Sequence, residues 1–302
     1  MRPTALDSAT EVEQVVRNLL RASKALDRFP TPVDTIIDYA DLAVAKNIDL
    51  DKVEAGFFPR LEFLSSALKK VLGLVDFRQR TIYLDQTLPA TRQAFIKLHE
   101  VGHGVMPWQR QLREGFADDE FTLDPDLNEH FECEANHFAS AALFQLDRFD
   151  DDLRSLPLAF KAIQALAQKY GSSIQAAARR YVARCPRRCA LLVLQKPILQ
   201  TETGSFSVPL RNCFESPGFV ADFGLMAIPD TCDLHFPFVR DIRRNRRFHE
   251  DGTITLVTLH NPSLLLNYHF FNNSYNSFVF LFPPGESISS RISIMERPPR
   301  SR

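Results

Sequence analysis

The sequence predicts an α+β protein with an α-rich first part, a helical connector and a β-containing last part. Apolar residues recur at helical spacing through most of the chain before about residue 185. After about residue 190 the chain changes to short runs of β-branched and aromatic residues, which are typical of strands. A length of 302 residues is enough for about two domains that each bury a core. We therefore expect an α-rich domain over 1–150, a helix-turn-helix-like connector over 151–189 and a β-rich domain over 190–302, for which a sensory and a regulatory role are both open.

Apolar stripes predict the helices. Val12, Val16 and Leu19 share one face of the first helix, and Pro30 follows its end. Thr91 is the expected N-cap of the fourth. The expected helices span about 10–28, 33–46, 60–71, 92–105, 129–145, 158–170 and 172–184.

Short runs rich in β-branched and aromatic residues predict the strands. In the first part, two such runs near 75–77 and 81–85 predict a hairpin, the basis of a small sheet with an exposed edge. The polar stretch 109–128 is expected to form a long surface loop. The strands expected in the last part span about 191–194, 206–208, 253–257 and 277–282.

The composition is that of an ordinary globular protein, with 45% hydrophobic and 24% charged residues. No stretch approaches the roughly 18 uninterrupted apolar residues of a membrane span, and the first residues contain no apolar segment typical of a secretory signal. Five cysteines, an odd number, do not indicate a disulfide framework. We expect a cytoplasmic protein that makes no membrane contact.

The charge is unevenly distributed. Residues 151–302 hold 19 Lys and Arg against 12 Asp and Glu, whereas the whole chain has a net charge of −1. The excess lies in two runs, at 179–188 and 240–247. Such a distribution is typical of a solvated basic face, and it also fits an anionic partner.

Residues 99–103 read His-Glu-Val-Gly-His, an H-E-x-x-H motif within the helix predicted over 92–105. Histidines four residues apart lie one above the other on a helix, so that His99 and His103 can share one cation. Neutral imidazole suits Zn²⁺, which takes three protein ligands and a water at catalytic sites. Mn²⁺ and Fe²⁺ are alternatives. Glu100 is placed to act as general base towards that water.

The third ligand is expected from the segment that follows Phe131. At about 100° per residue, Glu132 and Asn136 fall on the same flank of the apolar face of that helix, whereas Glu134 falls on the other side. We therefore expect Glu132 to bind the metal and Asn136 to hold a ligand by a hydrogen bond. Glu134 is expected to be a solvated helix charge.

The two motifs together resemble the ImmA/IrrE family of bacterial metallo-endopeptidases. The resemblance is specific over about 75–145, where the upstream strand, the H-E-x-x-H motif and the Glu-Cys-Glu-Ala-Asn segment at 132–136 follow in the family's order. It implies a zincin-like fold, zinc ligands at His99, His103 and Glu132, and a catalytic role for Glu100. The stretch 108–128 is longer than a tight connection requires.

The resemblance also implies a protein substrate. Some members of the family cleave a transcriptional repressor in a stress or mobile-element response, and a helix-turn-helix repressor is a candidate substrate here. We expect a zinc-dependent endopeptidase with that regulatory role. His130, His137 and Tyr181 are all candidates for the residue that stabilises the oxyanion, and the sequence does not choose among them. The strand at 81–85 is a candidate edge to which an extended peptide could add.

The alternative is a DNA-binding transcriptional regulator whose metal site is structural or vestigial. Residues 166–181 resemble a helix-turn-helix with flanking arginines, which makes contact with phosphate an open alternative. We favour a packing or protein-contact role for it. A structural zinc site has four protein ligands, and only three good candidates are visible.

Overall fold

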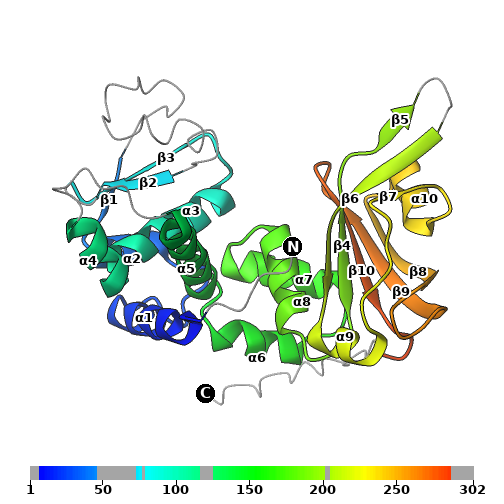
Figure 1. The fold of residues 1–302 in the computed structure, drawn as a ribbon, viewed down its shortest axis with the longest axis horizontal. Helices are drawn as coiled ribbons and strands as arrows, with labels where there is room; N and C mark the ends of the chain where they lie inside the picture. The colour runs from blue at the N-terminus through cyan, green and yellow to red at the C-terminus, as the bar shows by residue number, and fades with distance from the viewer. Residues whose placement is uncertain (1–6, 46–72, 77–78, 116–124, 201–204, 287–302) are drawn as a thin grey trace, which may run out of the picture. The chain divides into compact units, whose positions relative to one another are not determined.

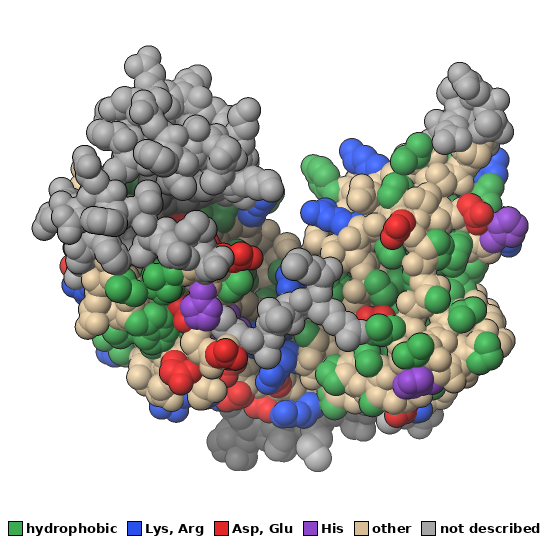
Figure 2. Space-filling model, in the orientation of Figure 1, with side chains coloured by type: hydrophobic (Ala, Val, Ile, Leu, Met, Phe, Trp, Pro, Cys, Tyr) green, Lys and Arg blue, Asp and Glu red, His purple; other side chains and the backbone are tan. Residues whose placement is uncertain are grey.

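The computed structural model describes residues 7–45, 73–76, 79–115, 125–200 and 205–286. These residues form two compact units, one drawn from 1–149 and 167–173 and the other from 150–166 and 174–302. The first is mostly helical and the second is built around a sheet (Figure 1), so the expected α+β class is confirmed. Apolar, acidic and basic side chains are interspersed on the face drawn in Figure 2. Within the described residues, no helix combines the length and the apolar character needed to cross a bilayer.

The first unit is organised around α5. Both α1 and α3 pack against this helix, and Val12, Phe138 and Ala142 are completely buried. Thr31 on the chain before α2 donates to the backbone oxygen of Leu143, at 2.7 Å. The helices of this unit are α1 (Ala9–Ala22), α2 (Val33–Tyr39), α3 (Ala90–Val105), α4 (Pro107–Gly115) and α5 (Pro125–Leu143).

A three-stranded sheet completes the first unit. Its strands are β1 (Ala43–Val44), β2 (Gly73–Asp76) and β3 (Thr81–Leu84). β3 is central, parallel to β1 and antiparallel to β2. The hairpin predicted from the sequence is present. The prediction that the strand at 81–85 is an edge is wrong, because β3 is paired on both sides.

Several predicted boundaries in the first unit were wrong. The first helix ends at Ala22, and Lys24 and Asp27 then take left-handed backbone conformations with φ of 58° and 63°. The second helix is interrupted in the same way after Tyr39, where Asp41 has φ of 54° and the chain enters β1. The N-cap of α3 is Pro89, not Thr91. The helix predicted over 60–71 lies outside the described residues.

The predicted loop over 109–128 is also wrong in its described parts, because α4 and the start of α5 occupy them. Beyond α5, the chain forms α6 (Asp147–Ser155), α7 (Phe160–Tyr170) and α8 (Ile174–Arg184). The last two match the predicted connector helices. Gly171 between them has φ of +69°, and a side chain there would meet Pro30 at 2.9 Å.

The second unit contains a seven-stranded antiparallel sheet. Its order is β5-β6-β4-β10-β9-β8, and β7 pairs with β6. The predicted strands at 191–194, 206–208 and 277–282 fall within three of these strands, and the one at 253–257 overlaps a fourth and extends one residue beyond its end. The strands are β4 (Ala190–Leu194), β5 (Ile198–Gln200), β6 (Ser205–Glu215), β7 (Thr231–Cys232), β8 (Phe248–Leu256), β9 (Leu264–Asn272) and β10 (Ser277–Phe282).

The central strands of this sheet are covered on both faces. Every residue of β4 and β10 is buried, which explains the apolar runs at 190–194 and 278–282. On one face, Leu192 and Val279 join a core that includes Phe238 of α10 (Pro237–Arg243). On the other, Tyr181 of α8 meets Phe280 of β10 edge to face, with ring centroids 5.6 Å apart. A further helix, α9 (Pro217–Phe223), begins at Ser216, whose side chain accepts from the backbone N–H of Phe219.

Candidate metal centre

Three side chains from α3 and α5 converge at one point. Nε2 of His99 lies 3.1 Å from Oε2 of Glu132, and Nε2 of His103 lies 3.3 Å from Oε1 of the same carboxylate. The two Nε2 atoms are 3.2 Å apart. The structure therefore brings together the three residues that the sequence predicts as metal ligands, and they form a group that could hold a metal ion.

The spacing of these atoms fits a tetrahedral zinc ion. Zinc binds imidazole nitrogen and carboxylate oxygen at about 2.0–2.2 Å, which places neighbouring ligand atoms of a tetrahedron about 3.3–3.6 Å apart. The two Nε2 atoms, 3.2 Å apart, lie just below that range, and each lies within 3.3 Å of one oxygen of the Glu132 carboxylate. Two imidazoles and one carboxylate are also the ligand set of catalytic zinc sites that keep a position for water.

The group is buried on the histidine side and open on the glutamate side. The side chain of His103 is 3% exposed and that of His99 is 15% exposed, whereas 43% of the Glu132 side chain is accessible. The exposed carboxylate leaves an approach for solvent or substrate on the glutamate side of the group.

Mutual hydrogen bonding shifts the pKa values of the group. Burial opposes ionisation of Glu132, but hydrogen bonds from His103 and His99 outweigh it and hold the pKa of Glu132 well below its usual range. Burial likewise lowers the pKa of His99, but hydrogen bonds with Glu132 and Asn136 and the nearby Glu100 charge raise it overall. The ionised carboxylate is the form that a metal requires.

Close packing of α3 on α5 sets this geometry. Gly102 lies within the H-E-x-x-H motif, and a Cβ added there would lie 3.0 Å from Cδ1 of Phe138 on α5. The missing side chain allows the two helices to approach closely. Glu132 lies less than two turns before Phe138, so this contact also places the carboxylate opposite the two imidazoles.

The proposed general base and the proposed supporting amide also lie at this centre. Glu100 follows His99 on α3 and is only 5% exposed. Asn136 lies one turn after Glu132 on α5, and its hydrogen bond with His99 contributes to the raised pKa of that imidazole.

A buried network behind His103 was not predicted from the sequence. Oε1 of Gln109 lies 2.7 Å from Nδ1 of His103, and Nε2 of the same amide donates to Oε2 of Glu134 at 2.6 Å. Trp108 Nε1 donates to that oxygen at 2.7 Å, and Ser8 donates to the other oxygen of Glu134. Glu134 is 2% exposed, so the prediction that it is a solvated charge is wrong.

The orientation of Gln109 decides the tautomer of His103. The amide nitrogen also donates to the backbone oxygen of Phe131 at 3.2 Å, so its oxygen must face the imidazole. Nδ1 of His103 therefore carries a proton, and Nε2, which faces His99 and Glu132, is the nitrogen that would bind a metal. Apolar periodicity does not indicate this network, because Gln109 falls in the stretch predicted as a loop.

The three candidate oxyanion donors lie in different surroundings. Tyr181 is completely buried and donates to the backbone oxygen of Pro157 at 3.3 Å, so it cannot reach a substrate. His137 lies 3.3 Å from Oε1 of Glu13, and His130 lies 3.3 Å from Oε1 of Glu134.

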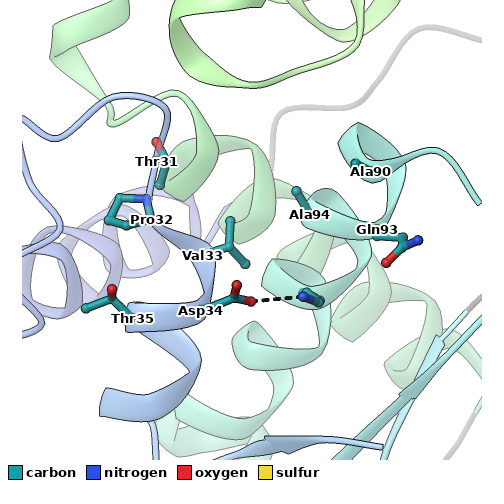
Figure 3. A pocket seen from close by; sticks show the side chains of 9 residues that line it. Thr31, Pro32, Val33, Asp34, Thr35, Ala90, Gln93 and Ala94 are labelled. Atoms are coloured by element: carbon teal, nitrogen blue, oxygen red, sulfur yellow. Dashed lines mark hydrogen bonds and ion pairs between the residues drawn. The ribbon is translucent and has the colours of Figure 1, made fainter. Parts of the chain in front are cut away.

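A cavity of about 430 Å³ in the first unit is separate from the metal centre. It lies between the start of α2 and the first turns of α3 (Figure 3). Its cation, Lys97, is paired with Asp34 at 2.9 Å. None of the three converging residues lines it.

A helix that carries His-Glu-x-x-His, with a carboxylate from a later helix facing both imidazoles, defines the class of H-E-x-x-H metal centres. Residues 59–181 match the family model described as the IrrE N-terminal-like domain, a metallopeptidase family. The match confirms the resemblance to the ImmA/IrrE family.

Among solved structures, the chain is similar to a Mycobacterium tuberculosis transcriptional regulator. The identity is 12%, the similarity covers 91% of this chain and 77% of that chain, and the TM-score is 0.51. At this identity the likeness shows a shared fold. No curated protein matches the chain.

Proposed function

We propose that this protein is a zinc-dependent endopeptidase. The observation that carries the proposal is the convergence of His99, His103 and Glu132 within 3.3 Å of one another, on helices that belong to a metallopeptidase family domain. His99 and His103 bind the metal through Nε2, and Glu132 binds it through its carboxylate. A bound zinc ion polarises the scissile carbonyl and lowers the pKa of a coordinated water.

The chain's own residues then move the protons. Glu100 accepts a proton from the attacking water and passes it to the leaving amine. Its side chain is only 5% exposed, beside His99 on α3. The ionised Glu132 is a ligand and is not available as the base.

Gln109 and Glu134 position His103 in this proposal, and Asn136 supports His99. The proton on Nδ1 of His103 is held by Gln109, and the buried carboxylate of Glu134 fixes Gln109 in turn. Such supporting hydrogen bonds fix ring orientation and increase ligand basicity.

We further propose a regulatory substrate, a transcriptional repressor, in a stress or mobile-element response. The fold shared with a transcriptional regulator is in keeping with this role. The rival is a DNA-binding regulator, but the described part of α8 buries Ala177, Ala178 and Tyr181, and its Arg179 lies over the Phe214 ring at 5.7 Å. This burial favours a packing role for the helix-turn-helix-like segment.

Incubation of the zinc-loaded protein with repressors encoded beside its gene tests the proposal. We expect cleavage by the wild type and none by Glu100→Gln under the same zinc loading. Duplex binding that falls steeply with salt, together with cleavage of none of these repressors, would favour the rival.

A further inference from the structure

The second unit contains a cavity of about 740 Å³ that is distinct from the metal centre. Its walls are the chain after β4, the end of α10 with the residues that follow it, and the turn between β9 and β10. The volume lies in the range of about 300–1,000 Å³ that is typical of sites for small molecules.

The charges on its walls are all positive. Lys196, Arg246 and Arg247 line the cavity, and none of its described lining residues is Asp or Glu. Within the described residues, Lys196 and Arg247 have no carboxylate partner. By contrast, the single cation of the cavity in the first unit, Lys97, is paired with Asp34.

A buried carboxylate holds one of these cations in place. Asp241 has a side chain that is only 4% exposed, and its oxygens lie 3.2 Å from Nη1 of Arg246 and 2.9 Å from Nδ1 of His249. Tyr268 donates to it at 2.8 Å, and the backbone N–H of Arg246 donates to the backbone oxygen of Asp241 at 3.0 Å. Arg246 is therefore oriented before any ligand arrives, and its other N–H groups stay available.

A glycine in β8 makes room for the tyrosine of this network. Gly252 lies at an irregularity in the pairing of β8 with β9, and a Cβ there would lie 2.2 Å from the Tyr268 ring. The absence of a side chain makes room for the tyrosine that binds Asp241.

The turn between β9 and β10 presents donors. Oδ1 of Asn272 accepts the backbone N–H of Ser274 at 2.7 Å, and Oδ1 of Asn273 accepts the backbone N–H groups of Tyr275 and Asn276 at 3.0 and 2.8 Å. Because the backbone engages both oxygens, the side-chain NH₂ groups of these asparagines are left for a ligand. Donors and cations without carboxylates suit an anion.

We propose that this cavity binds a small organic anion with at least two phosphate or carboxylate groups. Lys196, Arg246 and Arg247 contact the negative groups, and the asparagine amides of the turn complete their hydrogen bonds. Apolar side chains of Ile242 and Phe271 in the same walls contact the body of the ligand. The concave shape and its volume favour a small molecule over nucleic acid.

Calorimetric titration of the full chain tests the proposal, with pyrophosphate as the phosphate probe and citrate as the carboxylate probe. We expect at least one probe to bind with one site per chain. Lys196→Gln and Arg247→Gln should each weaken that binding about tenfold, since each removes a charge-assisted hydrogen bond. The two probes tell phosphate from carboxylate recognition.

Arg243→Gln is the matched control, because Arg243 lies on α10 in the same basic run but does not line the cavity. It should change the affinity less than twofold, a bound set by the small effect of an exposed charge. Equal weakening by Arg243→Gln would show a general basic surface and overturn the proposal. Failure of both probes to bind, or binding of duplex DNA alone, would overturn it too.

Discussion

Gln109 donates a hydrogen bond of 2.6 Å to the buried carboxylate of Glu134. The oxygen of the same amide lies 2.7 Å from Nδ1 of His103, so the charge of Glu134 acts on the metal centre through a neutral amide. The two glutamates of α5 therefore have different places. Glu132 faces both imidazoles directly, and Glu134 acts behind one of them.

This relationship predicts the effect of removing the amide. Gln109→Leu should weaken zinc binding by about 10–100-fold, because His103 loses the partner that fixes its ring and its tautomer. Competitive zinc titration measures the affinity. In ¹⁵N NMR spectra, the metal-free wild type should show His103 protonated at Nδ1, and the variant should show a mixture of tautomers.

Gln111→Leu is the control for that experiment, because Gln111 lies on the same helix but is exposed. It should leave the zinc affinity and the spectrum unchanged. Unaltered affinity and tautomer in Gln109→Leu would show that the contact with His103 does not position the ring.

The two acidic roles at the centre can be separated. Glu132→Gln should weaken zinc binding, since a neutral amide oxygen is a poorer ligand than a carboxylate. Glu100→Gln should keep zinc and lose about 10²–10⁴-fold in cleavage rate through loss of the proton acceptor. Zinc content and cleavage of an identified repressor provide the two readouts. Parental cleavage by zinc-loaded Glu100→Gln would refute the mechanism.

The close approach of α3 and α5 predicts that Gly102 cannot be replaced without cost. Gly102→Ala should lower the free energy of unfolding by about 1–3 kcal/mol because its Cβ would press on Phe138 at 3.0 Å. An alanine in a helix would otherwise stabilise by up to about 1 kcal/mol. Gly104→Ala meets Leu42 only at 3.4 Å and should be neutral or stabilising. Urea denaturation compares them, and equal stabilities would contradict the packing argument.

The second unit contains a histidine that is held neutral. Burial lowers the pKa of His269 below its ordinary 6.5, and Nδ1 accepts the backbone N–H of Phe160 at 3.2 Å. The unfolded chain therefore binds this proton more readily, so the stability from the neutral ring is complete above pH of about 6.5 and falls as the pH falls below it.

Between about pH 7.5 and 5.5, the melting temperature of His269→Gln should therefore fall less than that of the wild type. The reason is that an amide oxygen accepts the same hydrogen bond without titrating. His235→Gln, at a histidine whose side chain is 93% exposed, should keep the wild-type slope. A slope for His269→Gln equal to that of the wild type would mean that this imidazole does not titrate on unfolding.

The sequence predicts the site best where the relative positions of residues depend on the geometry of a single helix. The spacing of His99, Glu100 and His103 depends only on helical geometry, and the helical face of Glu132 follows from the same period. The burial of Glu134 could not be predicted in this way, because it depends on contacts with Gln109 and Trp108. These residues belong to a helix whose polar sequence predicted a loop.

The last part of the fold shows the same limit. β10 was predicted because Phe278–Phe282 is an uninterrupted apolar run rich in aromatic residues. β9 was not predicted, because apolar and polar residues do not alternate along its sequence in step with burial. Leu265 is exposed, for example, although Leu264 and Leu266 on either side of it are buried. Left-handed residues such as Asp27 and Asp41 also end helices that apolar periodicity would continue, because that backbone conformation depends on local turns and tertiary contacts.

Zinc stoichiometry tests the account of the metal centre most directly. After equilibrium dialysis against limiting free zinc, elemental analysis of the wild type should find about one ion per chain. The double variant His99→Ala/His103→Ala should retain almost none, with its melting temperature checked to show that it is folded. Full zinc occupancy in that folded variant would contradict the assignment of these imidazoles as ligands.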